Sequence, residues 1–263
     1  MADELTFDDY INNPTGAKSR VVGEKEYARQ IYNKKYDNMI LLCANKIEYY
    51  LFKKENDRFL IYIKMPSETQ QGLTYDVVLD FTTKDDVVKR KQTLKDYNIR
   101  FFSNDPNFIF TYAYAFNKKQ LLVPEVKKKI SNKALETPPT KTNPYEMAGY
   151  IKTIYFSYIF MTLRGLFNKS LWLQASPINQ AKGFLQNNIM QSDEKLLFAQ
   201  NFKRLTANEK KLGKPMPISR SDPKGVEKAA KNTEHAVKFA RTVDKINREN
   251  KRRNNHYVHV VGK

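Results

Sequence analysis

Cysteine is almost absent from this chain, since Cys43 is the only one among 263 residues. A single cysteine cannot form an intrachain disulfide. Cys43 lies in the apolar run from Ile40 to Ala44, where such a residue ordinarily acts as a small buried hydrophobic side chain. This usage fits a reducing compartment.

Histidine and glycine are also scarce, which argues against several kinds of site. The three histidines are His235, His256 and His259, so the rest of the chain lacks the commonest general base, and a serine or cysteine triad is not expected. The pair His256 and His259 has no cysteine or carboxylate partner nearby in the sequence. We therefore interpret the three histidines as exposed polar groups rather than metal ligands. The nine glycines never cluster, and neither common phosphate-binding loop occurs. We predict no cofactor.

Long hydrophobic runs are missing as well. The longest apolar stretch, Ile151 to Leu166, contains Lys152 and Arg164 and is too short to span a bilayer. The N-terminus, MADELTFDDY, is acidic and lacks the apolar region of a signal peptide. These features predict a soluble protein with no membrane partner.

Positive charge is what the chain has in excess: 46 Lys and Arg against 28 Asp and Glu give +18. Such an excess repels itself in a compact state and indicates a polyanionic partner. Nucleic acid is the leading candidate, although an acidic protein surface or an anionic membrane would satisfy the same charge balance. The excess is concentrated between Lys203 and Lys263, which hold 17 basic and 6 acidic residues and only two aromatics, Phe239 and Tyr257.

The basic C-terminal segment contains the predicted binding residues. The cations that we expect to contact nucleic-acid phosphates or an acidic partner are Lys238, Arg241, Lys245, Arg248, Lys251, Arg252 and Arg253. Each phosphate contact would release counterions, so binding would weaken steeply with salt. The alternative is a solubilising or disordered end with no dedicated partner. No motif for sequence-specific recognition is visible, so binding is expected to be nonspecific.

Apolar runs of strand length, separated by polar turns, predict an antiparallel meander in the middle of the chain. The predicted strands are Met39 to Lys53, Arg58 to Met65, Leu73 to Phe81 and Ile99 to Ser103. In Asn107 to Leu122 every second residue from 108 to 116 is aromatic, which favours a strand, although Asp105-Pro106 would also start a helix. The predicted helices are Glu24 to Lys35; Asp85 to Tyr97, with Val87, Val88 and Leu94 facing inward; Asn143 to Phe167; Val226 to Asn250; and Asp193 to Leu212, capped by Ser192.

The predicted fold class is therefore α+β, with a small antiparallel sheet packed with helices and then a helical and extended basic C-terminal region. The expected parts are an extended arm at 1–23, an α+β body at 24–135, an extended Pro/Thr-rich linker at 136–145, a helical region at 146–212 and a basic arm at 213–263. The aromatic runs YYLF and FIFTYAYAF could be platforms on which bases stack. Packed core or subunit interface is the favoured interpretation of both runs.

One set of acids could belong to a metal-dependent nuclease. Glu48, Asp76, Asp80 and Lys84 fall on or beside predicted strands, and a divalent cation would require two or more of the carboxylates to converge. The usual pairing of an acid and a lysine two positions apart on one strand is missing. The alternative is that Asp76 and Asp80 face solvent from the polar side of a half-buried sheet.

Residues 60–160 resemble virion-associated proteins of tailed bacteriophages, particularly those of low-GC hosts. The strings that carry the resemblance are MPSET, YDVVLDF, IRFFSNDPNFIFTYAYAF and TPPTKTNPYE. The resemblance implies a part built into a virion that is assembled in the bacterial host cytoplasm, with other virion proteins as partners and an oligomeric state within the assembly. It carries no catalytic or binding residue across, and the segment after Lys203 lies outside it.

Three functions follow as hypotheses. The first is a non-enzymatic structural protein of the capsid, neck or tail region, whose basic C-terminal arm contacts nucleic acid, DNA above all, or an acidic subunit. The second is a free, nonspecific nucleic-acid-binding protein in replication, transcription or packaging. The third is an enzyme, the metal-dependent nuclease that Glu48, Asp76 and Asp80 would form.

Overall fold

The structure is a computed structural model that describes residues 5–12, 31–40, 47–70, 72–83, 86–198 and 200. The expectations for Cys43, for Lys84, for the three histidines and for the chain beyond residue 200 lie outside these residues. The described chain up to residue 196 belongs to one compact unit.

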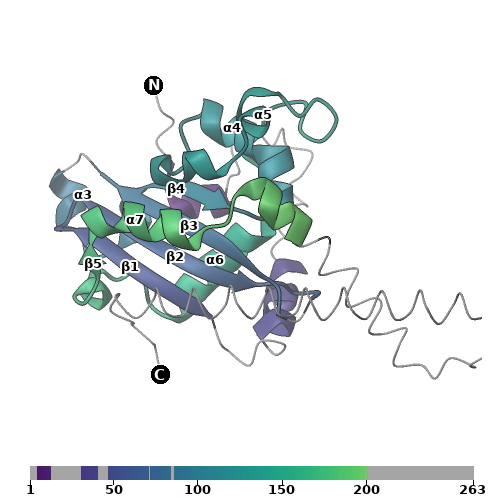
Figure 1. Ribbon diagram of the computed structural model, residues 1–263. Helices are drawn as coiled ribbons and strands as arrows, with labels where there is room; N and C mark the ends of the chain where they lie inside the picture. The colour runs from purple at the N-terminus through teal and green to yellow at the C-terminus, as the bar shows by residue number, and fades with distance from the viewer. Residues whose placement is uncertain are drawn as a thin grey trace, which may run out of the picture. The chain divides into compact units, whose positions relative to one another are not determined.

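A five-stranded sheet forms the centre of this unit, in the order β4-β3-β2-β1-β5 (Figure 1). The strands are β1 (Glu48–Lys54), β2 (Arg58–Pro66), β3 (Thr74–Thr82), β4 (Asn98–Ser103) and the two-residue β5 (Ser176–Pro177). β1 to β4 pair antiparallel, and β5 pairs parallel to β1, so the sheet is mixed. The predicted α+β class is confirmed.

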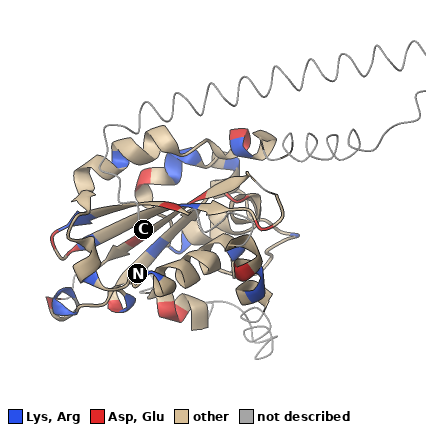
Figure 2. Cartoon of the chain, turned by 90° about the horizontal axis from the view of Figure 1, so that it is seen from below, with Lys and Arg blue, Asp and Glu red and all other residues tan. Residues whose placement is uncertain are grey.

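One face of the sheet is covered by α1 (Phe7–Asn12), α6 (Lys152–Leu163) and the 3-10 turn η4 (Lys169–Trp172). Side chains alternate between the two faces of a strand, and the odd-numbered residues of β2 and β3 point to this side. Phe81 packs 6.2 Å from Phe7, and Phe59 packs 5.4 Å from Trp172, measured between ring centroids. Figure 2 shows helices on both sides of the sheet.

The opposite face is covered by α7 (Ile178–Asn188) and the 3-10 helix η3 (Pro124–Lys129). Phe184 of α7 is fully buried, with its ring centroid 4.7, 5.2 and 5.3 Å from those of Tyr50, Phe52 and Tyr62. The even-numbered strand residues, which include Asp76 and Asp80, point to this side. The acids on the strands therefore point to the α7 face of the sheet rather than to its α6 face.

Both edges of the sheet are paired with other parts of the chain. The β4 edge bonds to two segments: the backbone N–H groups of Ile99 and Phe101 donate to the carbonyls of Leu5 and Leu121, both at 2.8 Å. At the β1 edge, β5 pairs only with Phe52 and Lys53. Exposed edges are templates for pairing with other chains, and the bonds to Leu5 and Leu121 restrict such pairing along β4.

The predicted strand at Asn107 to Leu122 is wrong, since this segment forms a π-helical turn, η2 (Phe108–Tyr112), followed by α4 (Ala113–Lys118). Aromatics at every second position also place residues 108, 112 and 116 four apart, which is one face of a helix. Phe108 and Phe116 are fully buried, 5.3 Å apart. The alternation of aromatics therefore fits both a strand, with its period of two, and one face of a helix, and it could not distinguish between them.

The predicted helix from Asn143 to Phe167 is shorter than expected, because α6 begins only at Lys152. The side chain of Asn143 accepts from the Met147 N–H at 2.9 Å and donates to its carbonyl, which holds a turn. The Tyr10 hydroxyl donates to the Gly149 carbonyl and accepts from the Ile151 N–H. These bonds occupy backbone groups that a helix would have used.

Further predictions also need correction. The arm expected to be extended at 1–23 contains the helix α1, and Phe7 and Tyr10 of this helix are fully buried. Residues 31–40 are helical and β1 begins at Glu48, so the strand expected from Met39 starts late. The helix expected at Asp85 to Tyr97 is reduced to α3 (Asp86–Arg90) and the 3-10 turn η1 (Leu94–Asp96), and Val87 is 65% exposed rather than inward. The Leu94 N–H donates to the Phe167 carbonyl at 2.7 Å, and this bond to a distant segment of the chain interrupts the helix.

The linker region is a turn rather than an extended segment. α5 (Asn132–Glu136) ends where the linker was expected to begin. The Asn143 N–H then donates to the Pro139 carbonyl at 2.8 Å, which closes a loop. Prolines therefore shape a tight connection here instead of keeping the chain straight.

Candidate nucleic-acid interface

The cations predicted to bind nucleic acid all lie beyond the described residues. The binding role of these residues remains a prediction: Lys238, Arg241, Lys245, Arg248, Lys251, Arg252 and Arg253. The described part of the chain bears instead on the acids of the alternative nuclease hypothesis and on the surface of the folded body.

The sheet places the three predicted acids on one face but does not bring them together. Glu48 on β1 lies opposite Lys64 on β2, and Lys64 lies opposite Asp76 on β3. Lys64 thus separates Glu48 from Asp76 and pairs with Glu48 at 3.3 Å. Asp80 is four residues further along β3, opposite Leu60.

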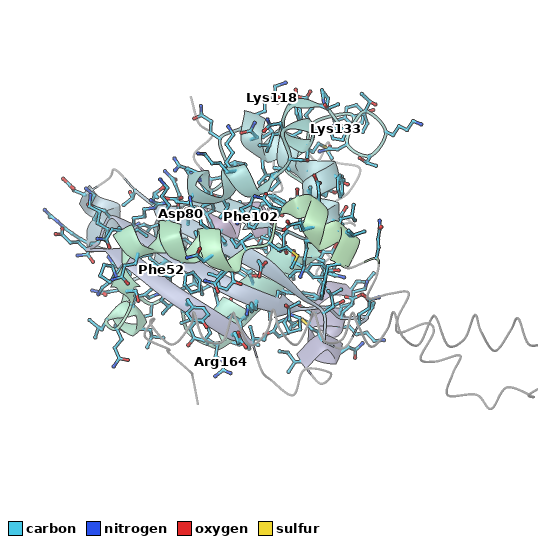
Figure 3. All side chains as sticks on the ribbon, viewed as in Figure 1. Phe52, Asp80, Phe102, Lys118, Lys133 and Arg164 are labelled. Atoms are coloured by element: carbon cyan, nitrogen blue, oxygen red, sulfur yellow. The ribbon has the colours of Figure 1, made fainter. Side chains whose placement is uncertain are left out.

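Asp80, which is labelled in Figure 3, belongs to a buried ion-pair cluster with Arg58 and Glu125. Its carboxylate is 0% exposed and accepts two hydrogen bonds from Arg58, from Nε at 2.7 Å and from Nη2 at 2.9 Å. The same Nη2 lies 2.7 Å from Oε1 of Glu125 on η3. Burial raises the pKa of Asp80, and the bonds to Arg58 oppose that rise.

Arg58 is therefore shared by two carboxylates. Burial by itself would lower the pKa of Arg58, but the hydrogen bonds and charges of Asp80 and Glu125 more than offset it and the pKa is raised. A permanently charged guanidinium that bridges a strand to η3 fixes the position of η3 on the sheet.

Asp76 is also buried and fully occupied. Oδ1 accepts from the Tyr62 hydroxyl at 2.7 Å, Oδ2 accepts from the Asn104 side-chain amide at 2.5 Å, and the Asp76 N–H donates to Asn104 Oδ1 at 2.8 Å. Nearby, burial lowers the pKa of Lys195, an effect that the charge of Asp76 opposes. The alternative that Asp76 and Asp80 face solvent is wrong, since both side chains are interior.

The described residues hold no group of three or more histidine, cysteine or acidic side chains placed to bind a metal ion. Among them, the acids of the sheet act as partners of Arg58, Lys64, Tyr62 and Asn104. This arrangement supplies ion pairs and hydrogen bonds that position the sheet against α7 and η3. The role of these acids that the contacts support is to hold the fold together.

The aromatic runs lie mainly in the core. Tyr50 and Phe52 of YYLF are buried against α7, and Phe108 and Phe116 are buried against the β4 edge. Phe110 is the exception at 44% exposed. The favoured interpretation of packed core is confirmed for the buried members of both runs.

A group of exposed lysines on the folded body was not predicted from the sequence. Lys127 and Lys128 on η3 and Lys182 on α7 are exposed on the face of the molecule that covers Arg58. Two signals were present: three consecutive lysines from 127 to 129, and the absence of any Asp or Glu between Glu146 and Asp193. The concentration of charge near the C-terminus hid both.

Comparisons with known proteins give the chain no relatives: no family model, no curated protein and no solved structure matches it. In the described ranges, no helix has the length and apolar character needed to cross a membrane.

Proposed function

We propose that this protein is a non-enzymatic structural component of a tailed-phage virion, in the capsid, neck or tail region. Its folded body docks on neighbouring subunits, and its basic C-terminal segment contacts nucleic acid. The virion role rests on the resemblance of residues 60–160 to virion-associated proteins of tailed bacteriophages. The observation that carries the nucleic-acid contact is the uneven distribution of charge along the chain.

The segment from Lys203 to Lys263 holds 17 basic and 6 acidic residues, whereas the preceding 202 residues hold 29 and 22. A segment so rich in cations and so poor in aromatics gains little from burial and much from neutralisation by phosphates. The preceding body supplies the core instead, with large aromatic residues packed on both faces of the sheet.

The body also presents apolar side chains suited to contact with other subunits. Among the described residues up to 196, the large hydrophobic side chains that are exposed are Val87, Phe110, Tyr145, Leu163, Leu171 and Leu173. Aromatic and aliphatic side chains that are exposed on one subunit commonly become the buried centre of an interface. These side chains offer docking contacts that do not depend on the edges of the sheet.

A salt gradient on immobilised DNA tests the nucleic-acid part of the proposal. Replacing Arg248, Lys251, Arg252 and Arg253 with glutamine in the full chain should lower the salt concentration of elution markedly, because each phosphate contact contributes about 0.9 to the slope of log K against log salt. A matched control replaces four exposed cations of the body with glutamine: Lys34, Lys91, Lys141 and Arg164. Equal elution of the two variants would refute the role of the basic segment.

The same distribution of charge favours, as a second candidate, a free nonspecific nucleic-acid-binding protein in replication, transcription or packaging. The two functions differ in where the protein resides. Mass spectrometry of purified particles should find the chain at a fixed ratio to the major capsid protein if it is a virion component. Its absence from particles, together with DNA binding by the isolated protein, would favour the second candidate.

A further inference from the structure

The surface formed by η3 and α7 combines exposed lysines with a rigid attachment to the sheet. Lys127 and Lys128 are exposed, while Lys129 turns toward α7 and donates from Nζ to the Gln186 carbonyl at 2.7 Å. Lys182 is exposed one helical turn before Gln186. The lysines therefore project from elements whose relative position is fixed.

The acid of η3 is removed from this surface. Glu125 is the only acidic residue of η3, and its carboxylate points inward to Arg58 Nη2 at 2.7 Å. The buried cluster with Asp80 thus holds η3 in place and leaves its outer side to Lys127 and Lys128. In η3 the negative charge therefore points into the protein, and the positive charges of these two lysines face solvent.

α7 contributes hydrogen-bonding side chains without negative charge. Besides Lys182, its exposed side chains are Asn179, Gln180, Gln186 and Asn187. No residue of α7 is acidic. The acids that border the surface are Asp193 and Glu194, beyond Ser192, whose Oγ accepts from the Ser131 N–H at 3.2 Å.

The three exposed lysines have no acid partner within the described ranges. The ion pairs there involve other residues, and no described side chain bonds to the ammonium groups of Lys127, Lys128 or Lys182. The side-chain amide of Gln191 donates instead to the backbone carbonyl of Lys128 at 3.2 Å. Positive charge that the fold itself leaves unneutralised is available to an external anion.

We propose that this η3–α7 surface, made of Lys127, Lys128, Lys182 and the α7 amides, is a second binding site for nucleic acid. The inference rests on the proposed function. It adds a rigid, sequence-independent contact with the sugar–phosphate backbone to the contact made by the basic segment.

The chemistry of the surface favours nucleic acid over an acidic protein. Protein interfaces concentrate aromatic residues and arginine at their centres and are depleted in lysine, whereas this surface holds lysines and amides and none of the large exposed hydrophobic residues. Lysine ammonium groups act as point charges on phosphates, and amide side chains bond phosphate and sugar oxygens. The surface holds no arginine, so its cations meet phosphates as point charges rather than through a planar, forked guanidinium.

Two linked contacts bind more tightly than either alone, because the second is made within the same complex. The site on the body and the basic segment belong to one chain, so loss of either should weaken binding by more than its own affinity suggests. DNA affinity and its salt dependence therefore report on both.

Fluorescence anisotropy with a labelled DNA duplex at several salt concentrations tests the site in the full chain. The variant K127Q/K128Q/K182Q leaves Lys129 and its bond to α7 intact. We expect binding to fall at least tenfold at low salt and the slope of log K against log salt to decrease by about 2 to 3. The control K34Q/K141Q/R164Q removes the same charge elsewhere; Arg164 lies at the lower edge of the body in Figure 3. It should change affinity by less than threefold.

The outcomes separate this site from the proposed function. If the unmodified chain does not bind DNA, the proposed function fails. If it binds, and if the surface variant matches the control while the variant of Arg248, Lys251, Arg252 and Arg253 is weakened, the basic segment stands and the η3–α7 site is overturned. If polyglutamate of equal charge competes as well as DNA, and does so only with Lys127, Lys128 and Lys182 intact, the partner is an acidic protein surface and the assignment to nucleic acid is overturned.

Discussion

At the scale of single residues, the fold depends on a few polar groups placed inside an aromatic core. Arg58 joins β2 to β3 through Asp80 and to η3 through Glu125, so one side chain determines how three elements meet. A buried pair of this kind contributes little net stability compared with apolar packing, but removing one partner leaves an uncompensated charge. The position of η3, and with it of the exposed lysines, depends on this arginine.

Replacing Arg58 with alanine should destabilise the protein by about 3 to 5 kcal/mol, since Asp80 would remain buried without its counter-charge. Urea unfolding followed by circular dichroism measures the loss. The exposed pair between Lys91 and Asp96, at 3.6 Å, is the matched control, and Lys91→Ala should cost less than about 1 kcal/mol. Similar losses in both variants would contradict the structural role of the buried cluster.

Tyr97 links stability to alkaline pH. Burial, followed by the charges of Asp57 and Asp96, raises its pKa to about 12, and its hydroxyl donates to the Asn56 carbonyl at 2.9 Å. The raised pKa means that the neutral phenol is favoured in the folded state. The resulting stability is fully present below about pH 10, the ordinary pKa of tyrosine, and is lost as pH rises through 12.

Unfolding free energy measured from pH 9 to pH 12 should therefore fall less steeply in Tyr97→Phe than in the unmodified protein. Phenylalanine keeps the ring in place and removes the ionisable group. An unchanged slope in this variant would show that Tyr97 does not account for the alkaline loss.

At the scale of elements, α7 packs on the sheet through a buried face of Ala181, Phe184 and Leu185. Phe184 contacts three rings of β1 and β2, and half of the other residues of α7 are polar and exposed. The helix that carries Lys182 is thus held from its buried side and free of apolar residues on its outer side.

Phe184→Ala should destabilise the protein by about 3 to 5 kcal/mol, because it removes a fully buried ring and leaves a cavity among three others. Thermal or urea unfolding measures the change. Leu173, which is 77% exposed, provides the control, and its replacement by alanine should change stability by less than about 0.5 kcal/mol. A small loss in Phe184→Ala would mean that α7 is held by other contacts.

At the scale of the whole molecule, the aromatic core and the basic segment occupy different parts of the chain. The buried hydrophobic residues of the described body end at Ile189, whereas more than half of the excess charge lies after Lys203. Folding and binding should therefore be separable by truncation.

Deleting residues 214–263 should leave the body folded, with an unfolding midpoint within a few degrees of that of the full chain, and should sharply lower retention on DNA at low salt. Circular dichroism and a salt-gradient DNA column provide the two measurements. Loss of cooperative unfolding in the truncated chain would contradict the separation. Residual retention of the truncated chain that disappears in K127Q/K128Q/K182Q is expected from the η3–α7 surface.

The amino-acid sequence was sufficient for the local features. Arg58 to Met65 and Leu73 to Phe81 were predicted within one residue of β2 and β3, since β-branched and aromatic runs bounded by polar turns have few other conformations. The scarcity of cysteine and histidine, and the concentration of positive charge after Lys203, are likewise evident from the sequence itself. The α+β class follows from such local patterns.

Only the tertiary structure decided features that depend on distant partners. Phe108 to Phe116 became helical because the place beside β4 belongs to Leu121–Val123, and α6 was shortened because Tyr10 bonds Gly149 and Ile151. Asp80 is buried because Arg58 pairs with it inside the protein, and Glu125 turns inward to the same arginine. The lysines of η3 therefore remain on its outer side. Backbone and charged groups take whichever partner the fold brings near, and no local pattern names a partner many residues away.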